Sequence, residues 1–185
     1  MLPALCAGCG ICAGSCPSST PFRRAPILAS GIELPDLPMD DLRRALDAAV
    51  GHGERTVIVF ACSPGRSAAA RDDARAARID VECAAMVPPA FVEYALRAGA
   101  AGVVIAGCRQ GDCEYRLGDA WTDARVAGLR APVLRSVVPR DRVRLAWCGN
   151  DARAVRRAID ELAAAPLPSP RRPARQATPQ ELPHA

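Results

Sequence analysis

Four cysteines and a proline lie within the first 17 residues, in the pattern C-x2-C-x2-C-x3-C-P. Two-residue spacers let the backbone wrap around an iron–sulfur cubane, so that three thiolates reach three irons. Zinc sites more often use two separated C-x2-C pairs. The pattern therefore favours a [4Fe–4S] cluster over a zinc ion or free thiols. The predicted ligands are Cys6, Cys9, Cys12 and Cys16, which we call the cysteine ladder.

The cysteine ladder is similar to that of bacterial ferredoxins, in which the fourth cysteine binds the other cluster of a two-cluster pair. This sequence contains one such ladder, so Cys16 lacks its usual neighbouring cluster. Three arrangements stay open. An upstream ladder is missing from the start of the sequence, Cys16 closes a single cluster through an adapted loop, or a partner subunit supplies the missing ligand.

A second group of cysteines follows the predicted strands. Three cysteines come directly after a strand, and a fourth lies five residues beyond the third. The carboxyl ends of parallel strands share one edge, where open α/β sheets place ligands. The glycines of the last loop let its backbone turn sharply around a bound group, and we interpret its aspartate as shaping the loop. The predicted metal ligands are Cys62, Cys83, Cys108 and Cys113, and the predicted cofactor-binding loop residues are Gly107, Gly111 and Asp112.

Three further residues are weaker candidates. Cys148 also ends a predicted strand, and we interpret it as a buried thiol, with an extra metal ligand as the alternative. Arg109 lies between Cys108 and Cys113, and Arg116 follows Cys113. Each is either a solvated side chain or a group that tunes the cluster potential or docks an acidic partner. The sequence contains no nucleophile–base pair and no phosphate-binding loop, so we expect no substrate site on this chain alone.

The elements that must position these residues alternate along the chain. Short apolar runs separated by helical patterns predict an α/β fold with a small four-stranded parallel sheet, flavodoxin-like in its order 2-1-3-4, and helices on both faces. A short ferredoxin-type segment precedes it. The predicted strands are 56–61, 79–82, 102–106 and 143–147, and the predicted helices are 67–78, 89–98, 114–129 and one around 155–162.

Composition divides the chain into four regions. A ferredoxin-type segment (1–17) precedes a linker and helix (18–53), the α/β domain (54–164), and a proline-rich tail (165–185) that we expect to be disordered. The net charge is +4, but the arginines are spread along the chain, so we expect no nucleic-acid binding. No signal peptide or membrane-spanning stretch is visible, which predicts a cytoplasmic protein whose thiols stay reduced.

The chain from Arg55 to about Leu162 resembles the delta subunit of methyl-viologen-reducing hydrogenase. The matching segments are 57–62, 83–100, 107–118 and 142–147, and the Gly-Cys-x-x-Gly-Asp-Cys run is the most specific of them. The resemblance implies a [2Fe–2S] cluster. It also implies that the protein carries electrons between a flavin-bearing partner and an iron–sulfur oxidoreductase, in complexes of the hydrogenase, formate dehydrogenase or heterodisulfide reductase kind.

One position departs from that family. The family usually carries Cys-x-x-Cys after the first strand, whereas this chain reads Cys62-Ser-Pro-Gly65. The four remaining family cysteines suffice for one [2Fe–2S] cluster, unless the lost cysteine is a required ligand. We therefore expect an electron-transfer subunit with a [4Fe–4S] and a [2Fe–2S] cluster. The alternatives are a redox- or metal-sensing regulatory protein and a zinc-binding structural module.

Overall fold

The computed structural model of the chain describes residues 34, 36–51, 55–62, 73–136, 138–149 and 151–166. The cysteine ladder, the tail after 166 and Gly65 lie outside these residues, so the predictions that rest on them stay predictions. No helix in the described part of the chain is both long enough and apolar enough to cross a bilayer.

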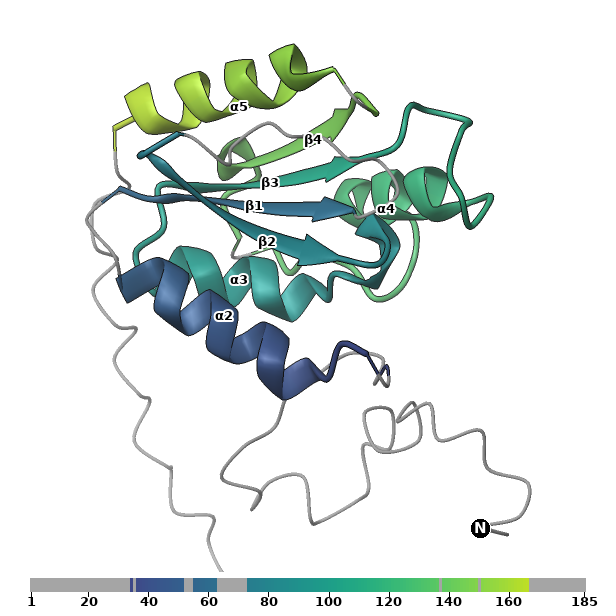
Figure 1. Cartoon of the computed structure of the whole chain (residues 1–185), viewed down its shortest axis with the longest axis horizontal. Helices are drawn as coiled ribbons and strands as arrows, with labels where there is room; N and C mark the ends of the chain where they lie inside the picture. The colour runs from purple at the N-terminus through teal and green to yellow at the C-terminus, as the bar shows by residue number, and fades with distance from the viewer. Residues whose placement is uncertain are drawn as a thin grey trace, which may run out of the picture.

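The centre of the fold is a four-stranded parallel sheet (Figure 1). Its order is β2-β1-β3-β4, which confirms the predicted topology. Every residue of β1 and β3 is buried, as expected for central strands of a parallel sheet covered on both faces. The strands are β1 (Val57–Cys62), β2 (Ala76–Val81), β3 (Gly102–Gly107) and β4 (Val143–Trp147).

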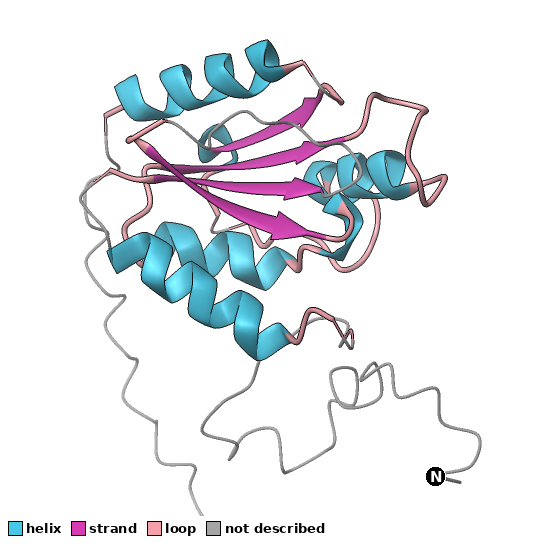
Figure 2. Ribbon diagram, in the orientation of Figure 1, coloured by secondary structure: helices cyan, strands magenta, loops and turns pink. Residues whose placement is uncertain are grey.

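Helices cover both faces of the sheet, as predicted (Figure 2). Helices α2 (Met39–Gly51) and α3 (Pro89–Arg97) lie on one face, and α5 (Ala152–Ala164) lies on the other. Helix α4 (Gly118–Ala127) is placed differently, beside the carboxyl ends of the strands. Two short 3-10 helices, η3 (Ala84–Met86) and η4 (Arg140–Arg142), complete the described elements.

The sheet divides the core into two layers because successive strand side chains point to opposite faces. Ile58 and Phe60 of β1 pack with the α2 and α3 side, while Val57 and Val59 pack with α5. Each of the outer helices buries one apolar stripe: Leu42, Leu46 and Ala49 on α2, and Val155, Ile159 and Leu162 on α5.

Two predicted helices have the wrong bounds. The helix expected over 67–78 is wrong at its end, because β2 begins at Ala76. The Asp73 carboxylate accepts the backbone N–H of Arg75 at 3.0 Å, which forms a turn into the strand. Pairing with β1 then overrides the helical propensity of the alanines. The helix expected from 114 begins only at Gly118, since residues 114–117 form turns.

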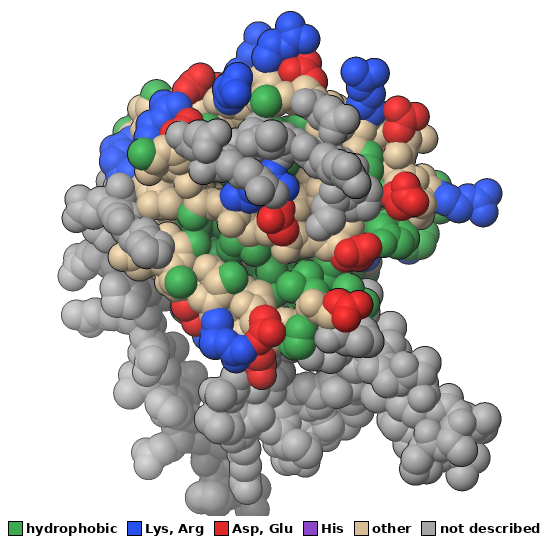
Figure 3. All heavy atoms as spheres, in the orientation of Figure 1, with side chains coloured by type: hydrophobic (Ala, Val, Ile, Leu, Met, Phe, Trp, Pro, Cys, Tyr) green, Lys and Arg blue, Asp and Glu red, His purple; other side chains and the backbone are tan. Residues whose placement is uncertain are grey.

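Charged side chains are dispersed over the surface. On the face shown in Figure 3, described arginines alternate with aspartates and glutamates instead of forming one basic area. Several of these charges form exposed pairs, such as Arg75 with Asp160 at 2.8 Å. Exposed pairs of this kind contribute only about 0–1 kcal/mol each, so stability rests mainly on the two apolar layers.

We predict that Gly102→Ala destabilises the domain by about 1–3 kcal/mol through overpacking. A Cβ at this position would lie 2.6 Å from Leu162 Cδ2, and Leu162 is buried in the α5-side core. Urea unfolding measures the change. Gly51→Ala is the matched control, because a Cβ there meets nothing within 4 Å.

The double variant Gly102→Ala/Leu162→Ala tests the cause. If the contact with Leu162 is the cause, the double variant loses less stability than the two single variants together. Additive losses would contradict the overpacking explanation.

Candidate metal centre

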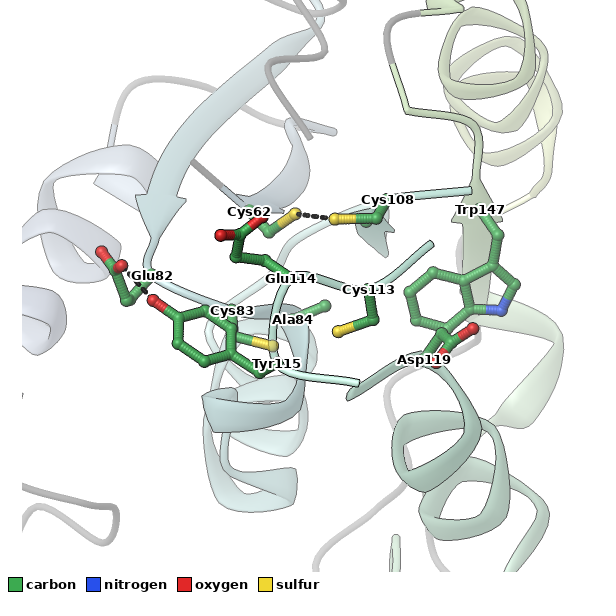
Figure 4. A pocket seen from close by; sticks show the side chains of 11 residues that line it. Cys62, Glu82, Cys83, Ala84, Cys108, Cys113, Glu114, Tyr115, Asp119 and Trp147 are labelled. Atoms are coloured by element: carbon green, nitrogen blue, oxygen red, sulfur yellow. Dashed lines mark hydrogen bonds between the residues drawn. The ribbon is translucent and has the colours of Figure 1, made fainter. Parts of the chain in front are cut away.

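The carboxyl edge of the sheet brings together four cysteines from three strand ends (Figure 4). Cys62 is the last residue of β1, and Cys108 follows β3 directly. Their sulfur atoms are 3.6 Å apart. Two thiolates on one tetrahedral metal, with metal–sulfur bonds of about 2.3 Å, would be separated by roughly 3.8 Å. The first pair therefore already has the spacing of two ligands on one metal atom.

The second pair consists of Cys83, which follows β2, and Cys113, in the loop after β3. Both side chains point into the same pocket as the first pair (Figure 4). A Cβ built on Gly118 would lie 2.7 Å from each of these two sulfur atoms, so the two sulfurs are at most about 5.4 Å apart. Gly118 therefore leaves open a space that any other residue would fill.

Cys83 is held by a short turn. It is the N-cap residue of η3, and its Sγ accepts the backbone N–H of Ala85 at 3.5 Å. Burial raises the pKa of the Cys83 thiol to about 11, and the neighbouring Cys113 adds to the shift. A metal that binds this thiol as thiolate must displace its proton.

The loop from Cys108 to Cys113 is fixed by a carboxylate on α4. Gly111 adopts a left-handed φ of +85°, and its backbone N–H donates to Asp119 Oδ2 at 2.7 Å. Asp119 is buried, and the Gly111 hydrogen bond holds the pKa of its carboxyl below the usual value. Asp119 is therefore a carboxylate that binds this loop, while the role of Asp112 stays a prediction. Asp112 is exposed.

An indole closes the β4 side of the pocket. Trp147 Nε1 donates to Asp123 Oδ1 of α4 at 2.9 Å. A Cβ on Gly107 would lie 2.4 Å from the Trp147 ring. Gly107 therefore leaves a space that the Trp147 indole occupies.

The pocket is acidic. Its described lining contains four thiols and the carboxylates of Glu82, Glu114 and Asp119, but no arginine. The Tyr115 hydroxyl donates to the Glu82 carboxylate, and this bond raises the pKa of Tyr115 to about 12.

The weaker candidates lie elsewhere. Cys148 is buried among the α5-side residues and is not part of the pocket lining. Arg109 and Arg116 are exposed.

The four thiols form two pairs, and among the described residues no group of three or more His, Cys, Asp or Glu side chains is placed to hold one metal ion. None of the described cysteines forms a disulfide. Four thiols around a space cleared by Gly118 suit a cofactor with two metal atoms, each taking one pair.

Sequence reasoning missed Gly118, Asp119 and Trp147. The sequence did contain one indication of the role of Asp119. An acidic residue in the first turn of a helix is well placed to bind backbone N–H groups. Its particular partner, Gly111, depends on the tertiary fold.

Comparison with known proteins gives a consistent picture. Residues 57–165 match the family described as methyl-viologen-reducing hydrogenase, delta subunit. The chain is 36% identical over 69 residues to an iron-sulfur subunit of the F420-non-reducing hydrogenase of Archaeoglobus profundus, covering 37% of this chain and 50% of that protein. It is 35% identical over 69 residues to an iron-sulfur subunit of the F420-non-reducing hydrogenase vhc of Methanococcus voltae, covering 37% and 48%. The chain thus spans about half the length of these relatives.

We predict that Gly118→Ala removes the iron and sulfide held by the four pocket thiols after anaerobic reconstitution and leaves any held by the cysteine ladder, because its methyl group occupies the space between Cys83 and Cys113. Circular dichroism should show an intact fold, since alanine favours a helix over glycine by about 1 kcal/mol. Gly51→Ala, in open space, is the control. Iron and sulfide at the wild-type level in Gly118→Ala would contradict this account of the site.

We predict that Asp119→Asn lowers the free energy of unfolding by about 1 kcal/mol at pH 7, since a neutral acceptor replaces a charged one. Because folding lowers the Asp119 pKa, its contribution is complete above the unfolded value near 4 and is lost as the pH falls through the lower folded value. The difference between wild type and variant should therefore shrink below about pH 4. Asp112→Asn, exposed on the same loop, should show no such difference.

Proposed function

Because this chain belongs to the methyl-viologen-reducing hydrogenase delta subunit family, we propose that it is an iron–sulfur electron-transfer subunit of a hydrogenase complex. The observation that carries the proposal is the convergence of four thiols from three strand ends on one pocket. Two relatives that are named as iron-sulfur subunits of hydrogenases support it.

The proposed cofactor of the pocket is a [2Fe–2S] cluster. Four cysteine thiolates are the usual ligands of such a cluster, and the two thiol pairs match a division between two irons. When bound, the cluster would supply a one-electron carrier. Gly118 leaves the space and Asp119 fixes the Cys108–Cys113 loop, while Trp147 covers one side against water.

The cysteine ladder is proposed to hold a second, [4Fe–4S] cluster through Cys6, Cys9, Cys12 and Cys16. The chain would then relay electrons between the two clusters and exchange them with flavin- and iron–sulfur-containing oxidoreductase subunits. It would have no substrate site of its own and would work in the cytoplasm.

Metal and sulfide counts on the full chain, purified anaerobically, test the proposal. We expect iron and acid-labile sulfide in proportions that fit one [2Fe–2S] and one [4Fe–4S] cluster, and two EPR signals on reduction. Zinc without sulfide would overturn the electron-transfer proposal and favour a structural zinc module. A single EPR signal would overturn the assignment of one of the two clusters.

Substitution of single cysteines assigns the clusters. We predict that Cys62→Ser and Cys108→Ser each abolish or strongly broaden the [2Fe–2S] EPR signal and leave the [4Fe–4S] signal in place, because each variant removes one thiolate from the first pair. Cys9→Ser should do the reverse. Cys148→Ser is the matched control, since this buried thiol lies outside the pocket lining. Loss of the [2Fe–2S] signal in Cys148→Ser would contradict the ligand assignment.

A further inference from the structure

Arg125 of α4 reaches the turn that holds Cys83. Its guanidinium donates to the backbone carbonyl of Ala85 through one terminal nitrogen. The backbone N–H of the same Ala85 donates to Cys83 Sγ at 3.5 Å. Arg125 therefore binds the carbonyl group of Ala85, and the N–H of the same residue donates to Cys83 Sγ.

Burial of the Arg125 guanidinium costs free energy. Its Nε is buried and has no hydrogen-bond partner among the described residues, and burial of an unpaired polar atom is unfavourable. Burial also lowers the pKa of the guanidinium, as does the neighbouring charge of Arg130, whereas a charged Cys83 raises it. The guanidinium nevertheless stays charged at neutral pH.

Among the described residues that line the pocket there is no arginine. These residues supply four thiols and three carboxylates, so a bound cluster with four thiolates would sit in a strongly negative surrounding. Reduction adds one more negative charge to the cluster. A partly buried cation behind one ligand favours the reduced state, and its effect is larger than that of an exposed cation because water screens it less.

We propose that Arg125 is a positioning residue of the cluster site, which fixes the Cys83 turn through Ala85 and places a partly buried positive charge that favours the reduced cluster. The proposal rests on the proposed [2Fe–2S] cluster in this pocket. Arg125 differs from Arg109 and Arg116, the arginines singled out in the sequence, because both of those side chains are exposed.

Potentiometric titration of the full chain, monitored by EPR of the [2Fe–2S] signal, tests the charge. At the wild-type midpoint potential, Arg125→Met should lower the ratio of reduced to oxidised cluster about tenfold, which is 59 mV for a one-electron couple. Arg125→Lys keeps a positive charge on a long side chain and should show a smaller decrease. Arg130→Met is the matched control, because Arg130 is exposed and stacks on Trp121 at 4.3 Å.

Hydrogen exchange of the metal-free chain tests the positioning separately. We expect faster exchange over 83–87 in Arg125→Met and wild-type exchange in Arg130→Met. A change of less than twofold in the reduced-to-oxidised ratio, an equal change in Arg130→Met, or unchanged exchange over 83–87 would overturn the proposal. If Arg125→Met no longer holds the cluster, a cluster retained by Arg125→Lys supports it, and loss in both variants with unchanged exchange overturns it.

The two proposals fail in different ways. A wild-type chain without iron and sulfide overturns the proposed function and, with it, the role of the charge. A wild-type chain with the cluster, in which Arg125→Met changes neither the potential nor the exchange, overturns only the role of Arg125.

Discussion

Parallel pairing of the strands is the constraint on which the candidate site depends. Because β2, β1 and β3 run in the same direction and in register, Cys62 lies opposite Val81, two residues before Cys83. The end of β3 adjoins the same edge, which places Cys108 beside Cys62. No local cysteine motif is needed, since strand pairing brings these cysteines together, whereas a ferredoxin-type ladder does so by short spacers.

Helix α4 is the second requirement, because it ties together the loops that the sheet only brings near. Asp119 binds the Cys108–Cys113 loop, Asp123 binds the indole of Trp147, and Arg125 binds the turn after Cys83. Gly118 leaves room for the thiols at its first residue. A helix of 10 residues thus binds the segments that follow β2 and β3 and the last residue of β4.

Much of the fold could be predicted because the central strands have a strong signal. The runs ending at Cys62 and Cys108 are apolar throughout, and both are buried on two faces. The weak signal of β2 explains the error there: it is an edge strand with an exposed Asp80, and only its pairing with β1 distinguishes it from a helix. Three pocket cysteines could be placed at one edge because they follow strand ends, and Cys113 because it lies in the short loop after Cys108. Arg125 could not, since its contact with Ala85 spans 40 residues and leaves no periodic pattern.

The indole of Trp147 also gives the molecule an optical property. It lines the same pocket as the four thiols, whereas the other tryptophan, Trp121, is on the exposed surface of α4. Iron–sulfur clusters absorb broadly across the range in which tryptophan emits, so energy transfer from Trp147 would be efficient at such close range. If the pocket holds the proposed cluster, intrinsic fluorescence of this chain would therefore report the occupancy of the pocket through Trp147.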